Sequence, residues 1–162
     1  MTTNPLDLAL QTELDGQKYY ENQADATSND QLKKVFEMLA KDEAEHCRVI
    51  SELKQGQYAN LSSETFKDVQ TIFAKQLSCG EPFKAEVNNL EAYEQAIRFE
   101  DESVALYKEL GAKAETDVER ELFQVLVREE LAHRIILQNL LEAIRRPQDW
   151  VENWEFNHLD EY

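Results

Sequence analysis

The chain of 162 residues carries 33 acidic and 17 basic side chains, which gives a formal net charge of −16 at pH 7. This length suits one domain with a full hydrophobic core, and the charge argues against nucleic acid or an anionic membrane surface as a partner, because like charges repel. Only four glycines and three prolines occur, and Glu, Ala, Leu, Gln and Lys dominate. This composition predicts an all-α protein.

Two helices are predicted in the first third of the chain. The first runs from about Pro5 to Ala26, with Asn4 as its N-cap and a proline that suits the first helical position. The second begins near residue 29 or 30, carries apolar side chains at helical spacing, and is stopped by Gly56.

The remainder contains two more long helices after a longer connection. That connection runs from about Gln57 to Pro82, has a short helix between Ser63 and Leu77, and is long enough to cross from one end of the fold to the other. The third helix is expected from about Phe83 to Ala114 and the fourth from about Thr116 to Arg145, with Pro147 ending it. Two pairs of helices with short internal turns and one long crossover predict a ferritin-like four-helix bundle.

The predicted bundle occupies residues 1–146, and residues 147–162 form a separate C-terminal tail. Its aromatic side chains are Trp150, Trp154, Phe156 and Tyr162. A tail of this composition is too aromatic for a solvated linker, so we expect it to pack on the bundle or on the second subunit of a homodimer. His158 is expected to be a surface or tail-packing residue.

Neither a membrane anchor nor a secretory leader is expected. No apolar stretch approaches the roughly 18 residues that cross a bilayer, and the first residues lack a basic region followed by an apolar one. We therefore expect a cytoplasmic protein. Cys47 and Cys79 form no CxxC pair, and in that compartment they are expected to be free thiols without a redox role.

A carboxylate and an imidazole stand three residues apart at two places in the chain. The pairs are Glu43 with His46 and Glu130 with His133, and they use two of the three histidines. Residues at i and i+3 share one face of a helix, so each pair can bind a metal side by side. Taken singly, such a pair in a charged helix is usually a solvated coincidence.

The two pairs belong to a longer internal repeat. They lie 87 positions apart, and the same offset relates Glu13 to Glu100 and Tyr20 to Tyr107. Each of these tyrosines follows its glutamate by two helical turns and projects from the same face. The chain is therefore predicted to be two tandem helical hairpins, with both tyrosines contacting the site; the alternative is a core tyrosine that is hydrogen-bonded elsewhere.

The inward-facing charged groups predict a di-metal carboxylate site. Buried carboxylates are costly unless paired or metal-bound, and four together repel one another, whereas two divalent cations would balance them. Such ligands suit Fe, Mn or Zn, and bridging carboxylates with open positions suit O₂ or peroxide chemistry at iron. One Glu from each of two helices and a Glu-x-x-His from each of the others is the known pattern. The predicted ligands are Glu13, Glu43, His46, Glu100, Glu130 and His133.

An acidic residue directly precedes the glutamate of each Glu-x-x-His motif. These residues are Asp42 and Glu129. Such a position can hydrogen-bond the far ring nitrogen of a ligand histidine on a neighbouring helix. We therefore expect Asp42 to contact His133 and Glu129 to contact His46.

Residues 5–145 resemble the rubrerythrin branch of the ferritin-like superfamily, through the segment from Leu32 to His46 and through Glu130-Leu-Ala-His133. The resemblance implies two irons per chain and either peroxide reduction or O₂-dependent oxidation of ferrous iron. It divides the ligands between the metals as Glu13 with His46 and Glu100 with His133, around the bridging Glu43 and Glu130.

The chain departs from typical rubrerythrins in two respects. They carry a rubredoxin-like domain with two CxxC pairs, which this chain lacks, so an external electron donor such as rubredoxin would be required. They also often carry an additional ligand glutamate one turn before the third-helix ligand, where this chain has Ile97.

Three classes of function remain open at this point. The first is a peroxide reductase that uses H₂O₂ and an external donor. The second is a ferroxidase that oxidises Fe²⁺ with O₂ or peroxide, and the third is a non-catalytic acidic helical interaction module. The presence of all ligands in both repeats argues against the third class.

Overall fold

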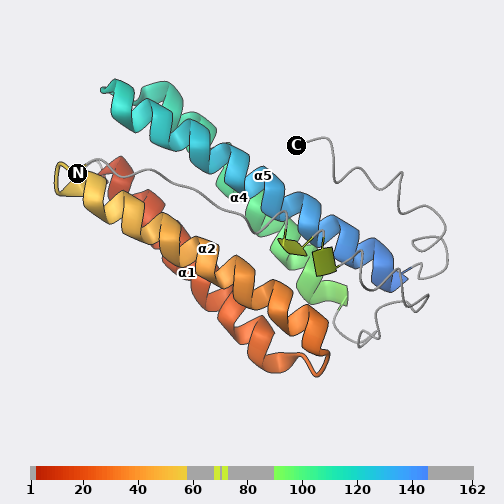
Figure 1. Cartoon of the computed structure of the whole chain (residues 1–162). Coiled ribbons are helices and arrows are strands. Elements are labelled where there is room, and N and C mark those ends of the chain that lie inside the picture. The colour runs from red at the N-terminus through yellow and green to blue at the C-terminus, as the bar shows by residue number, and fades with distance from the viewer. Residues whose placement is uncertain (1–2, 58–67, 70, 73–89, 146–162) are drawn as a thin grey trace.

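The computed structural model describes residues 3–57, 68–69, 71–72 and 90–145 (Figure 1). Four long helices make up nearly all of them, and these described residues contain no strand. The helices are α1 (Pro5–Ala26), α2 (Asp30–Lys54), α4 (Leu90–Lys113) and α5 (Asp117–Arg145). The predicted all-α class is confirmed. None of the described helices is long and apolar enough to cross a membrane.

Local capping interactions explain where the first two helices begin and end. The side chain of Asn4 accepts a hydrogen bond from the backbone N–H of Leu6 at 2.9 Å, and Pro5 is the first residue of α1. The side chain of Asn29 accepts two backbone hydrogen bonds from the first turn of α2, both 3.0 Å long. Gly56, two residues beyond α2, has a φ of 76°, a conformation that glycine adopts without strain.

The fourth helix begins near its predicted start, whereas the predicted start of the third helix lies outside the described residues. Thr116 caps α5, because its hydroxyl oxygen accepts a hydrogen bond from the backbone N–H of Glu119 at 3.2 Å. The expected start of the third helix near Phe83 and most of the short helix at 63–77 lie outside the described residues. So do Pro147 and the whole tail that follows it.

The helices pair as two hairpins, α1 with α2 and α4 with α5, and the hairpins meet through α1 with α4 and α2 with α5 (Figure 1). Figure 1 shows that α2 ends at one end of the bundle and α4 begins at the opposite end. Helix α4, with 24 residues, spans about 36 Å. The end of α2 and the start of α4 therefore lie a bundle length apart, as the crossover expected for a ferritin-like fold requires.

The hydrophobic core consists of two clusters at different levels of the bundle. One contains Leu39, Ile136 and Leu140, and the described residues Val69 and Ile72 of the connection also belong to it. The other contains apolar side chains from the opposite end of each helix, such as Ile50 and Leu126. Along α2 and α5 these apolar levels are separated by one buried charged level.

Replacement of the α2 cap tests this account of the helix start. An Asn29→Ala variant should lose about 1 kcal/mol of unfolding free energy, because two backbone N–H groups lose their acceptor. Urea denaturation followed by circular dichroism measures this change. Asn29→Asp is the control, since it keeps an acceptor oxygen and should retain most of the stability. Equal stability of wild type and Asn29→Ala would contradict the assignment.

Candidate metal centre

The charged level between the two apolar clusters contains side chains from all four helices. Helices α1 and α4 each supply one glutamate, while α2 and α5 each supply a glutamate and a histidine one turn apart. All six side chains are 0–2% exposed. They are Glu13, Glu43, His46, Glu100, Glu130 and His133. The structure thus brings together every residue that the repeat singled out as a ligand.

The Nδ1 atom of His46 is surrounded by carboxylate oxygens from three helices. It lies 3.0 Å from Glu13 Oε2, 3.2 Å from Glu43 Oε2 and 3.2 Å from Glu130 Oε1. These four residues form one cluster whose possible ligand atoms all lie within 4.8 Å of one another.

The Nδ1 atom of His133 has the corresponding surroundings. Its nearest carboxylate oxygens are Glu43 Oε1 at 3.2 Å, Glu130 Oε2 at 3.6 Å and Glu100 Oε1 at 3.7 Å. Glu43 and Glu130 therefore each turn one oxygen toward each imidazole. Both glutamates belong to both clusters, which is the arrangement that two bridging carboxylates require.

The cluster fits two divalent cations on grounds of geometry. Ligand atoms about 2.1 Å from an ion and at right angles to one another lie about 3 Å apart, close to the shorter spacings found here. Several of the buried atoms also have no hydrogen-bond partner among the described residues, a costly condition for a polar atom. They include Glu43 Oε1, Glu100 Oε2, Glu130 Oε1 and His133 Nδ1. Bound cations would satisfy these atoms.

The outer ring nitrogens of the two histidines face different surroundings. His133 Nε2 lies 3.0 Å from Asp42 Oδ2, which is the contact predicted for Asp42 from the sequence. A proton on Nε2 that is donated to Asp42 leaves the Nδ1 lone pair free to bind a cation. The matching contact, between His46 Nε2 and Glu129 Oε2, is 3.8 Å long. That distance is too long for a hydrogen bond, so the predicted bond of Glu129 is not formed.

Both repeat tyrosines contact the cluster, and each does so across the interface between hairpins. The Tyr20 hydroxyl of α1 donates to Glu100 of α4, and the Tyr107 hydroxyl of α4 donates to Glu13 of α1. Both side chains are fully buried. Each tyrosine therefore positions the glutamate that belongs to the other hairpin, and neither is bonded to an unrelated core group.

Burial and mutual repulsion change the proton affinities of the carboxylates. Burial, followed by the charge of Glu13, raises the pKa of Glu43 to about 8. Burial and the neighbouring Glu130 likewise raise the pKa of Glu100 well above its ordinary value. Burial alone would also raise the pKa of Glu13, but the charge of His46 and several hydrogen bonds lower it to about 2. Without a metal, the cluster thus holds protons at neutral pH.

The two histidines are also shifted toward their charged form. Burial disfavours an imidazolium ion, but the charge of Glu13 and hydrogen bonds to carboxylates raise the pKa of His46 well above its ordinary value. For His133, the hydrogen bond to Asp42 and the three neighbouring glutamate carboxylates raise the pKa against the effect of burial. A metal ion would replace these protons.

One residue at the site was not singled out from the sequence. A Cβ atom on Gly16 would lie 3.1 Å from Phe99 Cε1 and 3.4 Å from Glu43 Cδ. A Cβ atom there would crowd the ring of Phe99 and contact the Glu43 carboxylate. A glycine inside a helix costs about 1 kcal/mol relative to alanine, so its presence three residues after Glu13 was an available signal.

Two other residues considered in the sequence lie close to the centre without joining it. Cys47 is a buried free cysteine, and burial together with the charges of Glu13 and Glu43 raises the pKa of its thiol to about 12. Such a thiol is unreactive at neutral pH. Ile97 is partly buried and packs against the apolar cluster around Leu39, so its position offers no additional carboxylate.

A ferritin-like bundle with four glutamates and two histidines gathered in its core defines the class of di-metal carboxylate proteins. The family model for rubrerythrin matches residues 4–141. The chain therefore belongs to the rubrerythrin family, and its buried cluster is compatible with the di-iron site implied by that family. Comparisons with curated proteins and with solved structures gave no match.

Metal removal should expose the electrostatic cost of this cluster. The pKa of Glu43 is about 8 in the folded chain, against an ordinary value of 4.5. Protonation of Glu43 therefore favours the folded state, and this contribution to stability is lost as pH rises from 4.5 to about 8. The raised histidine pKa values act in the same direction above pH 6.5. The melting temperature of metal-free protein should therefore fall between pH 5 and pH 8 by roughly 5 °C or more.

Added metal should reverse this loss, because its ligands bind it in their deprotonated forms. Calorimetry of the metal-free and metal-loaded protein across this pH range measures both effects. The lowered pKa of Glu13 acts oppositely, and only below pH 4.5. A melting temperature that is unaffected by complete metal removal at pH 7 would contradict a buried, charge-compensated site.

Proposed function

We propose that this protein is a peroxide reductase with a di-iron centre held by the six buried ligands. The observation that supports this most directly is the sharing of Glu43 and Glu130 between two facing ligand sets. Carboxylate and imidazole ligands suit iron, and paired bridging carboxylates suit peroxide chemistry. Two ferrous ions bound there would supply the two electrons that, with two protons, convert one H₂O₂ to two waters.

The residues around the ligands hold them in position for this reaction. Asp42 fixes the ring of His133, and the hydroxyls of Tyr20 and Tyr107 each hold one oxygen of a terminal glutamate. The apolar clusters above and below exclude bulk water from the charged level. The buried centre is therefore suited to a small oxidant such as H₂O₂ or O₂.

The proposed reaction also requires a separate supply of electrons. The two electrons that a di-ferrous centre would supply suffice for one peroxide, and the two cysteines of the chain cannot form a rubredoxin iron site. We therefore propose a cytoplasmic protein, working as a homodimer, that is re-reduced by an external donor such as rubredoxin.

The bridging role of the shared glutamates can be tested through metal content. Wild type should bind about two metal ions, since two divalent charges balance four carboxylates. Glu43→Ala and Glu130→Ala should each lower the content to well below two, because each lost carboxylate contacts both ions. Metal analysis after dialysis measures the stoichiometry. Glu37→Ala, an exposed change on the same helix as Glu43, is the control. Two ions retained by both site variants would remove the bridging assignment.

Peroxide titration of the ferrous protein tests the reaction itself. The purified chain should consume about one H₂O₂ per di-iron centre and then stop, even with NADH present, because each peroxide takes the two available electrons. Addition of a rubredoxin and its reductase should restart consumption. Anaerobic stopped-flow absorption measures both phases.

Two outcomes of this titration would contradict the proposal. Sustained NADH-driven turnover by the purified chain alone would show an electron-entry route that its cysteines do not provide. Continued oxidation and uptake of Fe²⁺ supplied in excess, without turnover of an added donor, would indicate a ferroxidase instead.

A further inference from the structure

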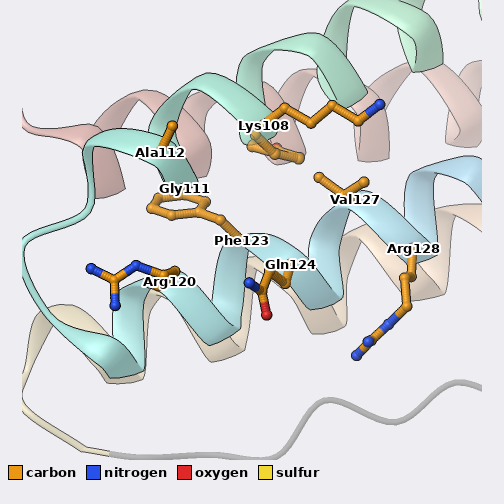
Figure 2. Close-up of a pocket in the computed structure, with 9 residues that line it drawn as sticks. Lys108, Gly111, Ala112, Arg120, Phe123, Gln124, Val127 and Arg128 are labelled. Carbon is orange, nitrogen blue, oxygen red and sulfur yellow. The ribbon is translucent and has the colours of Figure 1, made fainter.

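A groove lies between α4 and α5 and has none of the six metal ligands in its lining (Figure 2). Its volume is about 500 Å³, within the range of small-molecule sites. Apolar groups line its floor, among them Gly111, Phe123, Val127 and the buried ring of Tyr107. Tyr107 is the residue whose hydroxyl donates to the ligand Glu13. The groove thus reaches to within one side chain of the metal centre.

The charged side chains of this α4–α5 groove are all basic. Lys108 stands on the α4 side, and Arg120 and Arg128 stand on the α5 side (Figure 2). No acidic residue lines the groove among the described residues, although the chain carries a net charge of −16. Arg120 is paired with Asp117, whereas Lys108 and Arg128 form no ion pair within the described part of the chain.

The internal repeat supplies a second groove for comparison. It lies between α1 and α2 and has a volume of about 460 Å³. Six of its eight lining residues stand 87 positions before residues that line the α4–α5 groove. There Lys108 corresponds to Glu21 and Gln124 to Glu37, and only Lys41, the counterpart of Arg128, is basic. The basic character is therefore specific to the α4–α5 groove and is not a consequence of the fold.

The floors of the two grooves differ as well. Gly111 takes the place of Ala24, and a Cβ atom on Gly111 would approach Phe123 Cβ to 3.3 Å. Tyr107 and Phe123 line the α4–α5 groove, while their counterparts Tyr20 and Phe36 do not line the other. Only the α4–α5 groove has aromatic side chains among its lining residues, and both rings are almost completely buried.

We propose that the α4–α5 groove binds a small organic anion with an aromatic or other apolar body. Gly111, Ala112 and Val127 offer accessible apolar surface to the body of such a ligand. Lys108 and Arg128 offer unpaired positive charge to its carboxylate, sulfonate or phosphate group. This site is separate from the ligand cluster and does not depend on the peroxide chemistry proposed above.

Fluorescence titration with 8-anilinonaphthalene-1-sulfonate tests the proposal, because this probe joins a sulfonate to aromatic rings and becomes fluorescent in apolar surroundings. We expect saturable binding of about one probe per chain. Lys108→Glu/Arg128→Glu should weaken it by about tenfold or more, since both attractive contacts become repulsive. The neutral analogue N-phenyl-1-naphthylamine, which lacks the sulfonate, should bind both proteins equally.

A matched control separates the groove from the overall charge. The control variant Lys33→Glu/Lys41→Glu changes the net charge by the same amount as the groove variant. Its two positions lie in the first hairpin and are equivalent to Arg120 and Arg128. This control should leave the probe affinity unchanged. Circular dichroism melts confirm that each variant is folded. If the glutamate variant does not fold, Lys108→Gln/Arg128→Gln provides the same comparison without repulsion.

Three results would overturn the proposal. The first is equal probe affinity in wild type and in the folded groove variant. The second is an equal loss of affinity in the matched control, which would show that the probe responds only to net charge. The third is absence of probe binding together with self-association of wild type, measured by sedimentation and abolished by the groove variant. That result would identify the groove as an interface between copies.

Discussion

Repulsion among four carboxylates in an apolar interior is the constraint on which this bundle depends. Glu43 and Glu130 approach both imidazoles, and the remaining two glutamates complete the cluster from the other helices. The unfolded chain leaves these groups in water, so burying them works against folding unless protons or cations compensate. The stability of this fold and the function of its centre are therefore coupled.

The surrounding residues can be understood as responses to that constraint. Tyr20 and Tyr107 donate hydrogen bonds to glutamates of the opposite hairpin, and Asp42 accepts one from a histidine. Gly16 leaves room for the carboxylate of Glu43. Each of these residues satisfies or accommodates a polar group that the apolar clusters cannot. Together they hold the ligands in the geometry of the cluster.

Much of this arrangement was predictable because its determinants are local or periodic. The caps at Asn4 and Asn29 and the stop at Gly56 follow from nearest-neighbour chemistry, and the helix bounds agree with them. The 87-residue offset selected all six members of the cluster, because equivalent positions in two helical hairpins face the same axis. It also selected both tyrosines, although it did not show that each would bond to the opposite hairpin.

Other features required the packed structure. Glu129 and Asp42 occupy equivalent positions in the repeat, yet only Asp42 comes within hydrogen-bond distance of its histidine. The difference of less than 1 Å depends on how the helices pack and not on spacing along the chain. The crowding at Gly16 involves Phe99 of another helix. The sequence could show a glycine inside a helix, but not what lies opposite it.

The division of the ligands between the hairpins bears on the origin of the chain. Each hairpin contributes two glutamates, one histidine and one tyrosine, and each tyrosine bonds a glutamate of the other hairpin. A single ancestral hairpin could not have assembled the centre alone, but two identical copies related by a two-fold axis would have supplied the full set. Glu21 and Lys108 stand at equivalent positions and carry opposite charges, which two identical copies could not.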